Sequence, residues 1–563
     1  MQSIPRPEHP NPQWQRGNWR SLNGEWEFDF DFGNSGQARG LHRAEQLPLR
    51  IQVPFCPESK LSGIGFTDFI PAVWYRREVE ISAAELQGRV RLHFGAVDYD
   101  ARLWVNGKEA GRHTGGYTSF SFDVTAKLRP GKNVIILNAQ DDTRDPLAPT
   151  GKQSEEYHSH TCFYTRTTGI WQTVWLEFTP KSYIVDAKFR PDPENGCLHL
   201  CACVEGQGSL TAKAFWEGRE VGCATAKTSG NAVRLTLPLS ETHLWEVGKG
   251  GLYNLELTYG EDTVRSYFGL RSLLLDGHTF RINGKSVFQR LVLDQGFYPD
   301  GIYTAPTAEA LENDISLSMA AGFNGARLHQ KVFEPLFLYY ADKLGYLCWG
   351  EFADWGMDNR SPEALHKFLP QWAEAVQRDI NHPAIVGWCP HNETANTQYD
   401  DTIRLVYEMT KRLDPDRPCI DTSGYHHTDT DVFCVHDYAQ DPAEFAAHYA
   451  YFKGRKDDAF HQSDWHWGYK GQAMFVSEYG GIGWATGDGW GYGNAPKTEE
   501  EFKARYKGLT DVLLDHPHMF AFCYTQLTDV EQERNGVYTY DRQAKFDPAF
   551  FKAVNARKAV IED

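Results

Sequence analysis

Two glutamates in the second half of the chain stand where apolar runs end, beside polar neighbours suited to catalysis. The run at residues 384–388 is short enough for a buried strand, and it leads to Asn392 and Glu393. A second apolar run, residues 474–480, delivers Glu478 in the same way. Two carboxylates that share one site can cleave a glycosidic bond, because one protonates the leaving oxygen while the other attacks the sugar or activates water.

An alternation of strands and helices beyond residue 275 is expected to position these carboxylates. One helix is predicted to begin at Thr307 and end at Gly322, and another to begin at Pro335 and end at Gly345. Eight strands are predicted, at residues 286–293, 325–329, 346–351, 384–390, 418–422, 432–438, 474–478 and 519–525. This count is typical of a (β/α)8 TIM barrel, whose chemistry lies at the C-terminal strand ends. Residues 273–563 are therefore predicted to form a catalytic TIM barrel.

The first half of the chain has short strand-like runs and turn signals but almost no helical periodicity. Residues 1–180 are predicted to form an all-β domain, in which Asn106 and Gly107 make a hairpin turn because both residue types accept positive φ. Residues 181–272 have the length of a small immunoglobulin-like β-sandwich and carry no candidate chemistry.

Composition limits the partners. The net charge of −18 argues against nucleic acid and anionic membranes, since phosphate binding needs clustered Lys and Arg. The 14% aromatic content, with 17 Trp, suits sugar stacking and large cores equally. The chain opens without a signal-peptide pattern and has no apolar run long enough to span a bilayer, so a cytoplasmic protein is expected.

The eleven cysteines are scattered, and most stand inside apolar runs, which predicts reduced core thiols. The cluster Cys197, His199, Cys201 and Cys203 alternates at period two. That spacing fits one face of a strand better than the loop-borne pairs of a zinc site, so no metal is expected there.

Several segments together resemble glycoside hydrolase family 2, which includes β-galactosidases, β-glucuronidases and β-mannosidases. In the predicted barrel they are residues 322–329 (GFNGARLH), 381–388 (NHPAIVGW), 391–393 (HNE) and 476–480 (VSEYG). Residues 74–77 (WYRR) and 168–175 (TGIWQTVW) resemble the N-terminal jelly-roll of that family, and residues 280–285 (FRINGK) its entry into the barrel. The resemblance covers nearly the whole chain and implies a jelly-roll β-sandwich for residues 1–180.

The resemblance also implies a retaining exo-β-glycosidase, with Glu393 as acid/base and Glu478 as nucleophile of a double displacement. Asn392 would hydrogen-bond the sugar 2-hydroxyl, and Arg327 would keep Glu478 ionised. Tyr438, at the end of the sixth strand, is a candidate to hydrogen-bond the nucleophile. A structural salt bridge and a simple rim tyrosine are the plainer interpretations of Arg327 and Tyr438.

Seven further residues near predicted strand ends are candidates for substrate binding: Asp294, Glu351, His329, His391, Trp355, Trp484 and Tyr524. The carboxylates would hold sugar hydroxyls, the Trp and Tyr rings would form stacking walls, and the histidines would contact the sugar or orient a neighbour. For each, packing in the core or at the rim is the alternative. Polar loops of the first domain, residues 140–146 and 157–166, are candidates to complete the pocket.

Two departures from the family bear on cofactor and sugar. Residues 351–357 (EFADWGM) lack the Glu-x-His pattern that binds magnesium in well-studied β-galactosidases, so neither metal nor cofactor is expected. The Asn-x-Lys motif with which bacterial β-glucuronidases pair the uronate carboxylate is missing from residues 531–541, although Arg534 could substitute for its lysine.

These departures favour a neutral sugar, with a β-galactosidase-like activity leading by family abundance alone. The first alternative is a β-glucuronidase or β-galacturonidase acting on uronides. A catalytically inactive carbohydrate-binding protein is an alternative of another class. The expected partner is a small glycoside or oligosaccharide, and homo-oligomerisation is left open.

Overall fold

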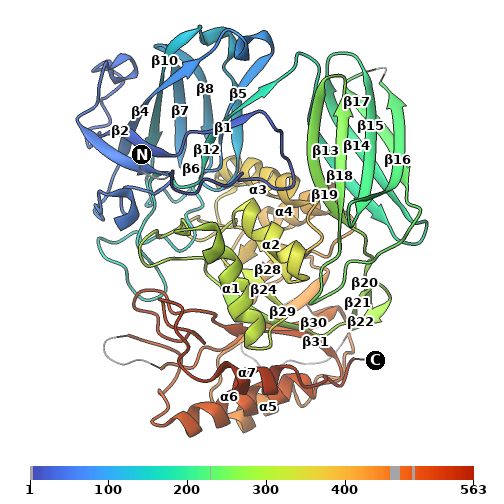
Figure 1. Cartoon of the computed structure of the whole chain (residues 1–563). Helices are drawn as coiled ribbons and strands as arrows, with labels where there is room; N and C mark the ends of the chain where they lie inside the picture. Colours follow the sequence, from blue (N-terminus) through green and yellow to red (C-terminus); the bar gives the residue numbers. More distant parts are fainter. Residues whose placement is uncertain (1–3, 229, 457–468, 485–488, 563) are drawn as a thin grey trace.

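The computed structural model describes residues 4–228, 230–456, 469–484 and 489–562. Two β-sandwiches, blue and green in Figure 1, lie side by side above a barrel that is yellow to red. No helix among the described residues is long and apolar enough to cross a membrane.

The first sandwich consists of two antiparallel sheets, one of six strands and one of four. The six-stranded sheet, in order, contains β3 (Leu49–Val53), β2 (Gly24–Phe30), β4 (Ala72–Ile81), β10 (Gly131–Gln140), β7 (Asp100–Val105) and β8 (Lys108–Thr114). The other contains β1 (Trp19–Ser21), β12 (Val174–Thr179), β5 (Arg89–Phe94) and β9 (Phe120–Asp123), and the short strands β6 (Val97–Asp98) and β11 (Gly169–Ile170) pair separately. The predicted hairpin turn is confirmed: Val105 pairs with Lys108, with φ of 52° at Asn106 and 73° at Gly107.

The second sandwich begins with β13, directly after β12. Its three-stranded sheet contains β13 (Tyr183–Asp192), β14 (Cys197–Glu205) and β17 (Ala232–Pro238). Its four-stranded sheet contains β16 (Arg219–Lys227), β15 (Ser209–Trp216), β18 (Leu252–Tyr259) and β19 (Asp262–Gly269). Alternate residues of facing strands, such as Leu200, Ala212 and Leu257, are buried between the sheets.

A small antiparallel sheet, β20 (Leu273–Asp276), β21 (Thr279–Ile282) and β22 (Lys285–Ser286), leads into the barrel. Seven parallel strands then form one curved sheet, in the order β26 (Ile385–Cys389), β25 (Leu347–Glu351), β24 (Gly325–Leu328), β23 (Gln289–Asp294), β31 (Met519–Thr525), β30 (Ala473–Gly480) and β29 (Val432–Asp437). The predicted fifth strand lies between the two ends of this sheet and pairs with the fourth strand in two short steps. These are a parallel bridge from Trp388 to Cys419 and the pairing of β27 (His391–Asn392) with β28 (Thr422–Ser423). The fold is thus a TIM barrel.

Seven helices surround the described part of the barrel: α1 (Ala308–Ala320), α2 (Pro335–Leu344), α3 (Leu365–Asp379), α4 (Asp400–Leu413), α5 (Pro442–Tyr449), α6 (Glu499–Leu514) and α7 (Pro548–Asn555). The predicted limits of the first two are confirmed, since Thr307 caps α1 and Gly345, at φ 71°, ends α2. The strict strand–helix alternation is wrong at one place. Residues 424–431, all described, join β28 to β29 without a helix, because eight residues are too few for a helix and two turns.

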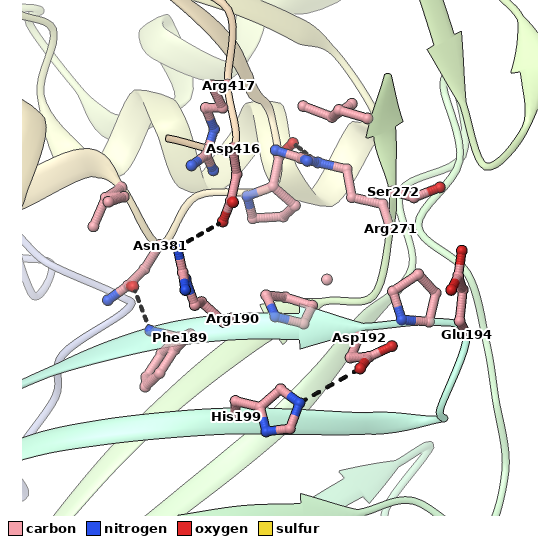
Figure 2. A pocket seen from close by; sticks show the side chains of 16 residues that line it. Phe189, Arg190, Asp192, Glu194, His199, Arg271, Ser272, Asn381, Asp416 and Arg417 are labelled. Carbon is pink, nitrogen blue, oxygen red and sulfur yellow. Dashed lines mark hydrogen bonds and ion pairs between the residues drawn. The ribbon is translucent and has the colours of Figure 1, made fainter. Parts of the chain in front are cut away.

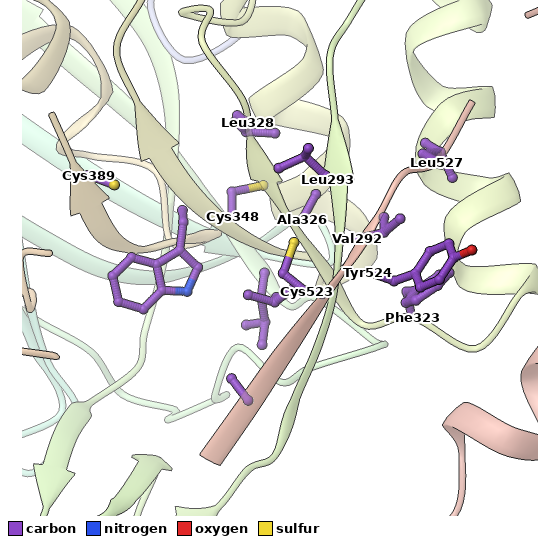
Figure 3. Close-up of a cluster of buried hydrophobic side chains, with 14 of the residues drawn as sticks. Val292, Leu293, Phe323, Ala326, Leu328, Cys348, Cys389, Cys523, Tyr524 and Leu527 are labelled. Carbon is purple, nitrogen blue, oxygen red and sulfur yellow. The ribbon is translucent and has the colours of Figure 1, made fainter. Parts of the chain in front are cut away.

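The barrel core includes buried residues from both sandwiches, although each sandwich also has a separate core of its own. Figure 3 shows part of it, with Leu293 and Ala326 beside the sulfurs of Cys348 and Cys523. The same buried cluster includes Tyr117 and Trp171 of the first sandwich and Trp245 of the second. All eleven cysteines are free, and those predicted to lie in the core, Cys348, Cys389, Cys434 and Cys523, are buried.

The segment before β26 fastens the barrel to the second sandwich. The Asn381 side chain accepts a hydrogen bond from Phe189 N at 2.9 Å and donates one to Ala187 O at 2.8 Å, while His382 Nδ1 lies 2.6 Å from Asp342 Oδ2. A pocket of about 420 Å³ opens beside this junction, with Arg190 paired to Asp416 across it (Figure 2). The upstream part of the Asn-His-Pro segment therefore docks domains rather than contacting substrate.

We predict that Asn381→Ala lowers the free energy of unfolding by about 1–3 kcal/mol, because two interdomain hydrogen bonds are lost. Chemical denaturation followed by tryptophan fluorescence measures the change. Asn231→Ala, at an exposed position of the second sandwich, is the matched control and should change stability by less than about 0.5 kcal/mol. Equal effects of the two substitutions would show that the Asn381 amide does not fasten the domains.

Candidate active site

Arg327 stands at the centre of the barrel mouth and organises the groups around it. It comes from β24 and is fully buried. Its guanidinium donates to Glu351 Oε1 at 2.5 Å, to Glu478 Oε1 at 3.0 Å and to Asn392 Oδ1 at 3.1 Å. The guanidinium therefore links side chains from three strand ends. Each of these side chains occupies one of the alternating strand positions that point into the barrel.

Glu478, near the end of β30, is held from three sides. Besides Arg327, it accepts a hydrogen bond from Tyr438 Oη at 2.5 Å, and His436 Nε2 lies 3.4 Å from its Oε1. Burial alone would raise the pKa of Glu478, but the charges of His436 and Arg327 and the Tyr438 bond lower the pKa well below its ordinary value. The carboxylate is therefore ionised at neutral pH, as a nucleophile requires.

His436 joins the two predicted catalytic carboxylates. Its Nδ1 lies 2.7 Å from Glu393 Oε1, and its Nε2 lies 2.9 Å from Ser423 Oγ as well as near Glu478. Burial lowers the pKa of this imidazole, but the charges of Glu478 and Glu393 outweigh burial and raise it above its ordinary value. His436 was missed from the sequence, although it stands two residues before Tyr438 and so on the same face of the strand.

Glu393 follows β27 with φ at 53°, a left-handed conformation that non-glycine residues rarely adopt. Its backbone N–H donates to Ser423 O at 2.8 Å, which holds this turn, and its side chain is 18% exposed, against 5% for Glu478. The neighbouring Asn392 has a buried Nδ2 without a hydrogen-bond partner in the described structure, so a donor remains available for a ligand.

The predicted candidates Glu351, His329 and Trp355 also lie at this mouth. Glu351 accepts from Arg327, and its Oε2 lies 3.0 Å from His329 Nδ1. The Trp355 indole donates to Asn392 O at 3.1 Å. A pocket of about 280 Å³ opens beside Glu393, lined by residues 354–360, residues 392–395 and Phe163 of the first sandwich.

Four predicted substrate-binding residues lie elsewhere, and three of them fail for one reason: adjacent strand residues point to opposite faces. Asp294 lies on the helix side of β23, where burial and Asp314 of α1 raise its pKa to about 7. The His391 ring stacks on Phe368 of α3 at 4.7 Å. Tyr524 packs on Tyr506 of α6 at 4.9 Å, and Figure 3 shows it across β31 from Cys523.

Trp484, the fourth, packs outside the mouth for a different reason. Its ring lies 6.1 Å from Phe502 of α6 and 5.0 Å from Phe546, so long-range apolar packing decides its position. Arg534, proposed to replace the missing lysine, is 35% exposed and points towards Asp529, 3.9 Å away. These predictions are corrected accordingly.

The first sandwich lends the mouth a segment that sequence reasoning found only in part. Within residues 157–166, Tyr164 Oη donates to Glu533 Oε2 at 2.5 Å. Lys152, which was not predicted, brings its ammonium to 4.4 Å above the Trp355 ring. The segment 140–146 contacts the barrel farther out, where Asp145 pairs with Lys367 of α3. No local pattern marks Lys152, because its position depends on docking between domains.

The separation of the carboxylates indicates the stereochemistry that the site can support. Oxygens of Glu393 and Glu478 and a nitrogen of His436 all lie within 4.8 Å of one another. Retaining glycosidases hold their carboxyl groups about 5–5.5 Å apart, and inverting ones about 6.5–9.5 Å. The three side chains also have the spacing of metal ligands, but each already has hydrogen-bond partners within the site.

Comparisons with known proteins identify the family of the chain. Residues 61–146 match the family described as Glycosyl hydrolases family 2, sugar binding domain, and residues 307–505 match Glycosyl hydrolases family 2, TIM barrel domain. The chain is 26% identical to a protein named beta-glucuronidase from Paenibacillus borealis, over 93% of this chain and 95% of the relative. It is 26% identical to the beta-glucuronidase of Felis catus, over 74% and 71%.

Solved structures share the whole fold. The beta-glucuronidase of Lactobacillus rhamnosus superposes with a TM-score of 0.81 at 19% identity, covering 100% of both chains. That of Ruminococcus gnavus in complex with D-glucuronic acid gives 0.80 at 18% identity, covering 98% of this chain and 99% of the other.

We predict that His436→Gln loses stability chiefly at low pH. The pKa of His436 is raised in the folded protein, so the imidazolium contributes stability below its unfolded pKa of about 6.5, and this contribution is lost as pH rises through the folded pKa. The difference in melting temperature between the wild type and His436→Gln should therefore shrink from pH 5.5 to pH 9. The exposed His366→Gln on α3 is the control, and its difference should stay flat. If the difference in melting temperature between the wild type and His436→Gln grew with pH, His436 would not act as a charged link between Glu393 and Glu478.

Proposed function

Because the chain belongs to glycoside hydrolase family 2 and is a glycosidase, we propose that it removes terminal β-linked uronic acids, β-glucuronides foremost, with retention of configuration. The observation that carries the mechanism is the pairing of Glu393 and Glu478 across the barrel mouth, with the second carboxylate kept ionised.

The mechanism follows from the contacts of these two side chains. Glu478 attacks the anomeric carbon while Glu393 gives its proton to the leaving oxygen, which breaks the glycosidic bond and forms a glycosyl ester on Glu478. Glu393 then takes a proton from water, whose oxygen attacks the same carbon and frees Glu478. The unpartnered Nδ2 of Asn392 is suited to bind the 2-hydroxyl, a bond that strengthens in the transition state.

The uronide class is supported by a relative that matches the chain nearly from end to end and is named beta-glucuronidase, and by further relatives of that name that match about three quarters of it. A β-galactosidase-like activity rested on family abundance alone, and the comparisons favour the uronide alternative over it. An inactive carbohydrate-binding protein is set aside, since the chain is a glycosidase whose two carboxylates keep their partners.

We expect Glu478→Gln to lower kcat roughly 10³-fold or more, because the amide cannot form the glycosyl ester. Time-resolved NMR of the wild-type reaction should detect the β-anomer of the free sugar before mutarotation. Gln543→Ala, a change on the C-terminal segment, should leave kcat unchanged and serves as the control. Initial release of the α-anomer would rule out the double displacement.

A panel of 4-nitrophenyl β-glycosides tests the sugar. Turnover should be highest on the glucuronide or galacturonide and at least about tenfold lower in kcat/KM on the matching glucoside and galactoside, because a carboxylate pairs with a cation that a hydroxymethyl group leaves unpaired. Preference for the neutral sugars would overturn the uronide proposal and restore the galactosidase interpretation, while the glycosidase mechanism would stand.

A further inference from the structure

We propose that Lys152, carried by the first sandwich, is the residue that recognises the carboxylate of the sugar, an inference that rests on the uronide activity proposed above. It would replace the lysine that is missing after the eighth strand. In this proposal, a lysine of the first sandwich determines which sugar the active site of the barrel prefers.

The backbone around Lys152 is fixed against the barrel. Thr150 N donates to Trp355 O at 2.8 Å, and Gly151 N donates to Ala353 O at 3.1 Å. Gly151 adopts φ of 62°, and a Cβ there would meet Gln330 O at 2.6 Å, so the close approach requires glycine. On the other side, Lys152 O accepts from Tyr164 N at 2.7 Å. The lysine is therefore held in place by its main chain.

The Lys152 side chain is largely buried, and its ammonium has no anionic partner among the residues that the structure describes. The residue is 5% exposed, and no carboxylate oxygen of the described residues lies within 4.0 Å of its Nζ. The ammonium makes a cation–π contact with the Trp355 ring at 4.4 Å. Such a contact offsets only part of the free-energy cost of removing an ammonium from water. A buried cation in this condition is suited to accept an anion.

Lys152 remains protonated. Burial alone would lower the pKa of its ammonium, but the nearby Cys162, Glu533, Glu478 and Glu393 raise the pKa above its ordinary value. The ammonium lies beside the catalytic mouth, because the Trp355 ring beneath it also lines the pocket next to Glu393. Trp355 connects the two, since its face meets Lys152 and its indole N–H donates to Asn392 O, next to Glu393.

The other cations around the mouth already have partners in the part of the chain that the structure describes. Arg327 is shared by Glu351, Glu478 and Asn392. Lys545 Nζ lies 2.6 Å from Asp529 Oδ1, and Lys331 Nζ donates to two backbone carbonyls. Arg534 points towards Asp529.

The carboxyl group of Glu533 is linked to Lys152 through Tyr164, which hydrogen-bonds to both, and it suggests how the uronate would be held. Glu533 accepts from Tyr164 Oη and from Asn535 Nδ2 at 3.0 Å. Burial raises the pKa of Glu533, and Lys152 opposes that shift. In a complex, Lys152 would pair with the uronate carboxylate. Glu533 would accept a hydrogen bond from a sugar hydroxyl or, in its protonated form, donate one to the uronate. The plainer role of Lys152, neutralising Glu533, predicts no discrimination between sugars.

The test compares 4-nitrophenyl β-D-glucuronide with 4-nitrophenyl β-D-glucoside, which differ only in the carboxylate. Lys152→Met keeps a long unbranched side chain at this position and removes the charge. We expect it to lower kcat/KM for the glucuronide by about 10- to 100-fold, chiefly through KM, with little change for the glucoside. Lys152→Arg should keep part of the preference. Arg534→Ala, the matched cation control, should leave the ratio unchanged.

A binding measurement separates this inference from the proposed function. D-glucaro-1,5-lactone and D-glucono-1,5-lactone differ in the same carboxylate, and calorimetry on the wild type and Lys152→Met needs no turnover. Selective loss of affinity for the glucarolactone supports the role of Lys152. Equal losses for both probes and both substrates, or no change, would overturn it even if the wild type hydrolyses glucuronides.

If the wild type instead hydrolyses only neutral glycosides and binds neither acid preferentially, the proposed function itself fails. Melting temperatures check that each variant folds. Should Lys152→Met not fold, Lys152→Gln provides the same neutral comparison and the same two outcomes.

Discussion

A single buried cation holds the reaction centre together. The guanidinium of Arg327 reaches one carboxylate on each of two strands and the side-chain amide of Asn392, which precedes Glu393. Each of these three polar groups would be costly to bury without a partner, and Arg327 joins them into one hydrogen-bonded set. His436 extends this hydrogen-bonded set to Glu393. The barrel can be regarded as the frame that brings these strand ends to one cation.

Much of this frame could be predicted from the sequence, because buried parallel strands read as short apolar runs and helices begin and end with recognisable caps. The two glutamates followed from their position at strand ends. What could not be read reliably was the face on which a strand-end residue lies. Asp294, His391 and Tyr524 stand at the correct height but point away from the axis, since a shift of one residue reverses a strand side chain.

Other differences depend on contacts between distant parts of the chain. Trp484 was expected in the pocket, but two phenylalanines, one from α6 and one from the C-terminal segment, provide its packing surface. Lys152 has no motif of its own, and its position depends on a glycine-mediated contact with a loop of the barrel. By contrast, His436 could have been found, because it shares a strand face with Tyr438.

The aromatic residues that both sandwiches contribute to the barrel core have a consequence for modular evolution. Tyr117, Trp171 and Trp245 belong to the same buried cluster as the barrel interior. The barrel is therefore not a domain that can be moved without the two sandwiches. An isolated barrel would expose that apolar surface and would lack the lysine at its mouth. Under the proposed role of Lys152, recombination that exchanged the first sandwich between relatives would transfer sugar preference with the sandwich and leave Glu393 and Glu478 in the barrel.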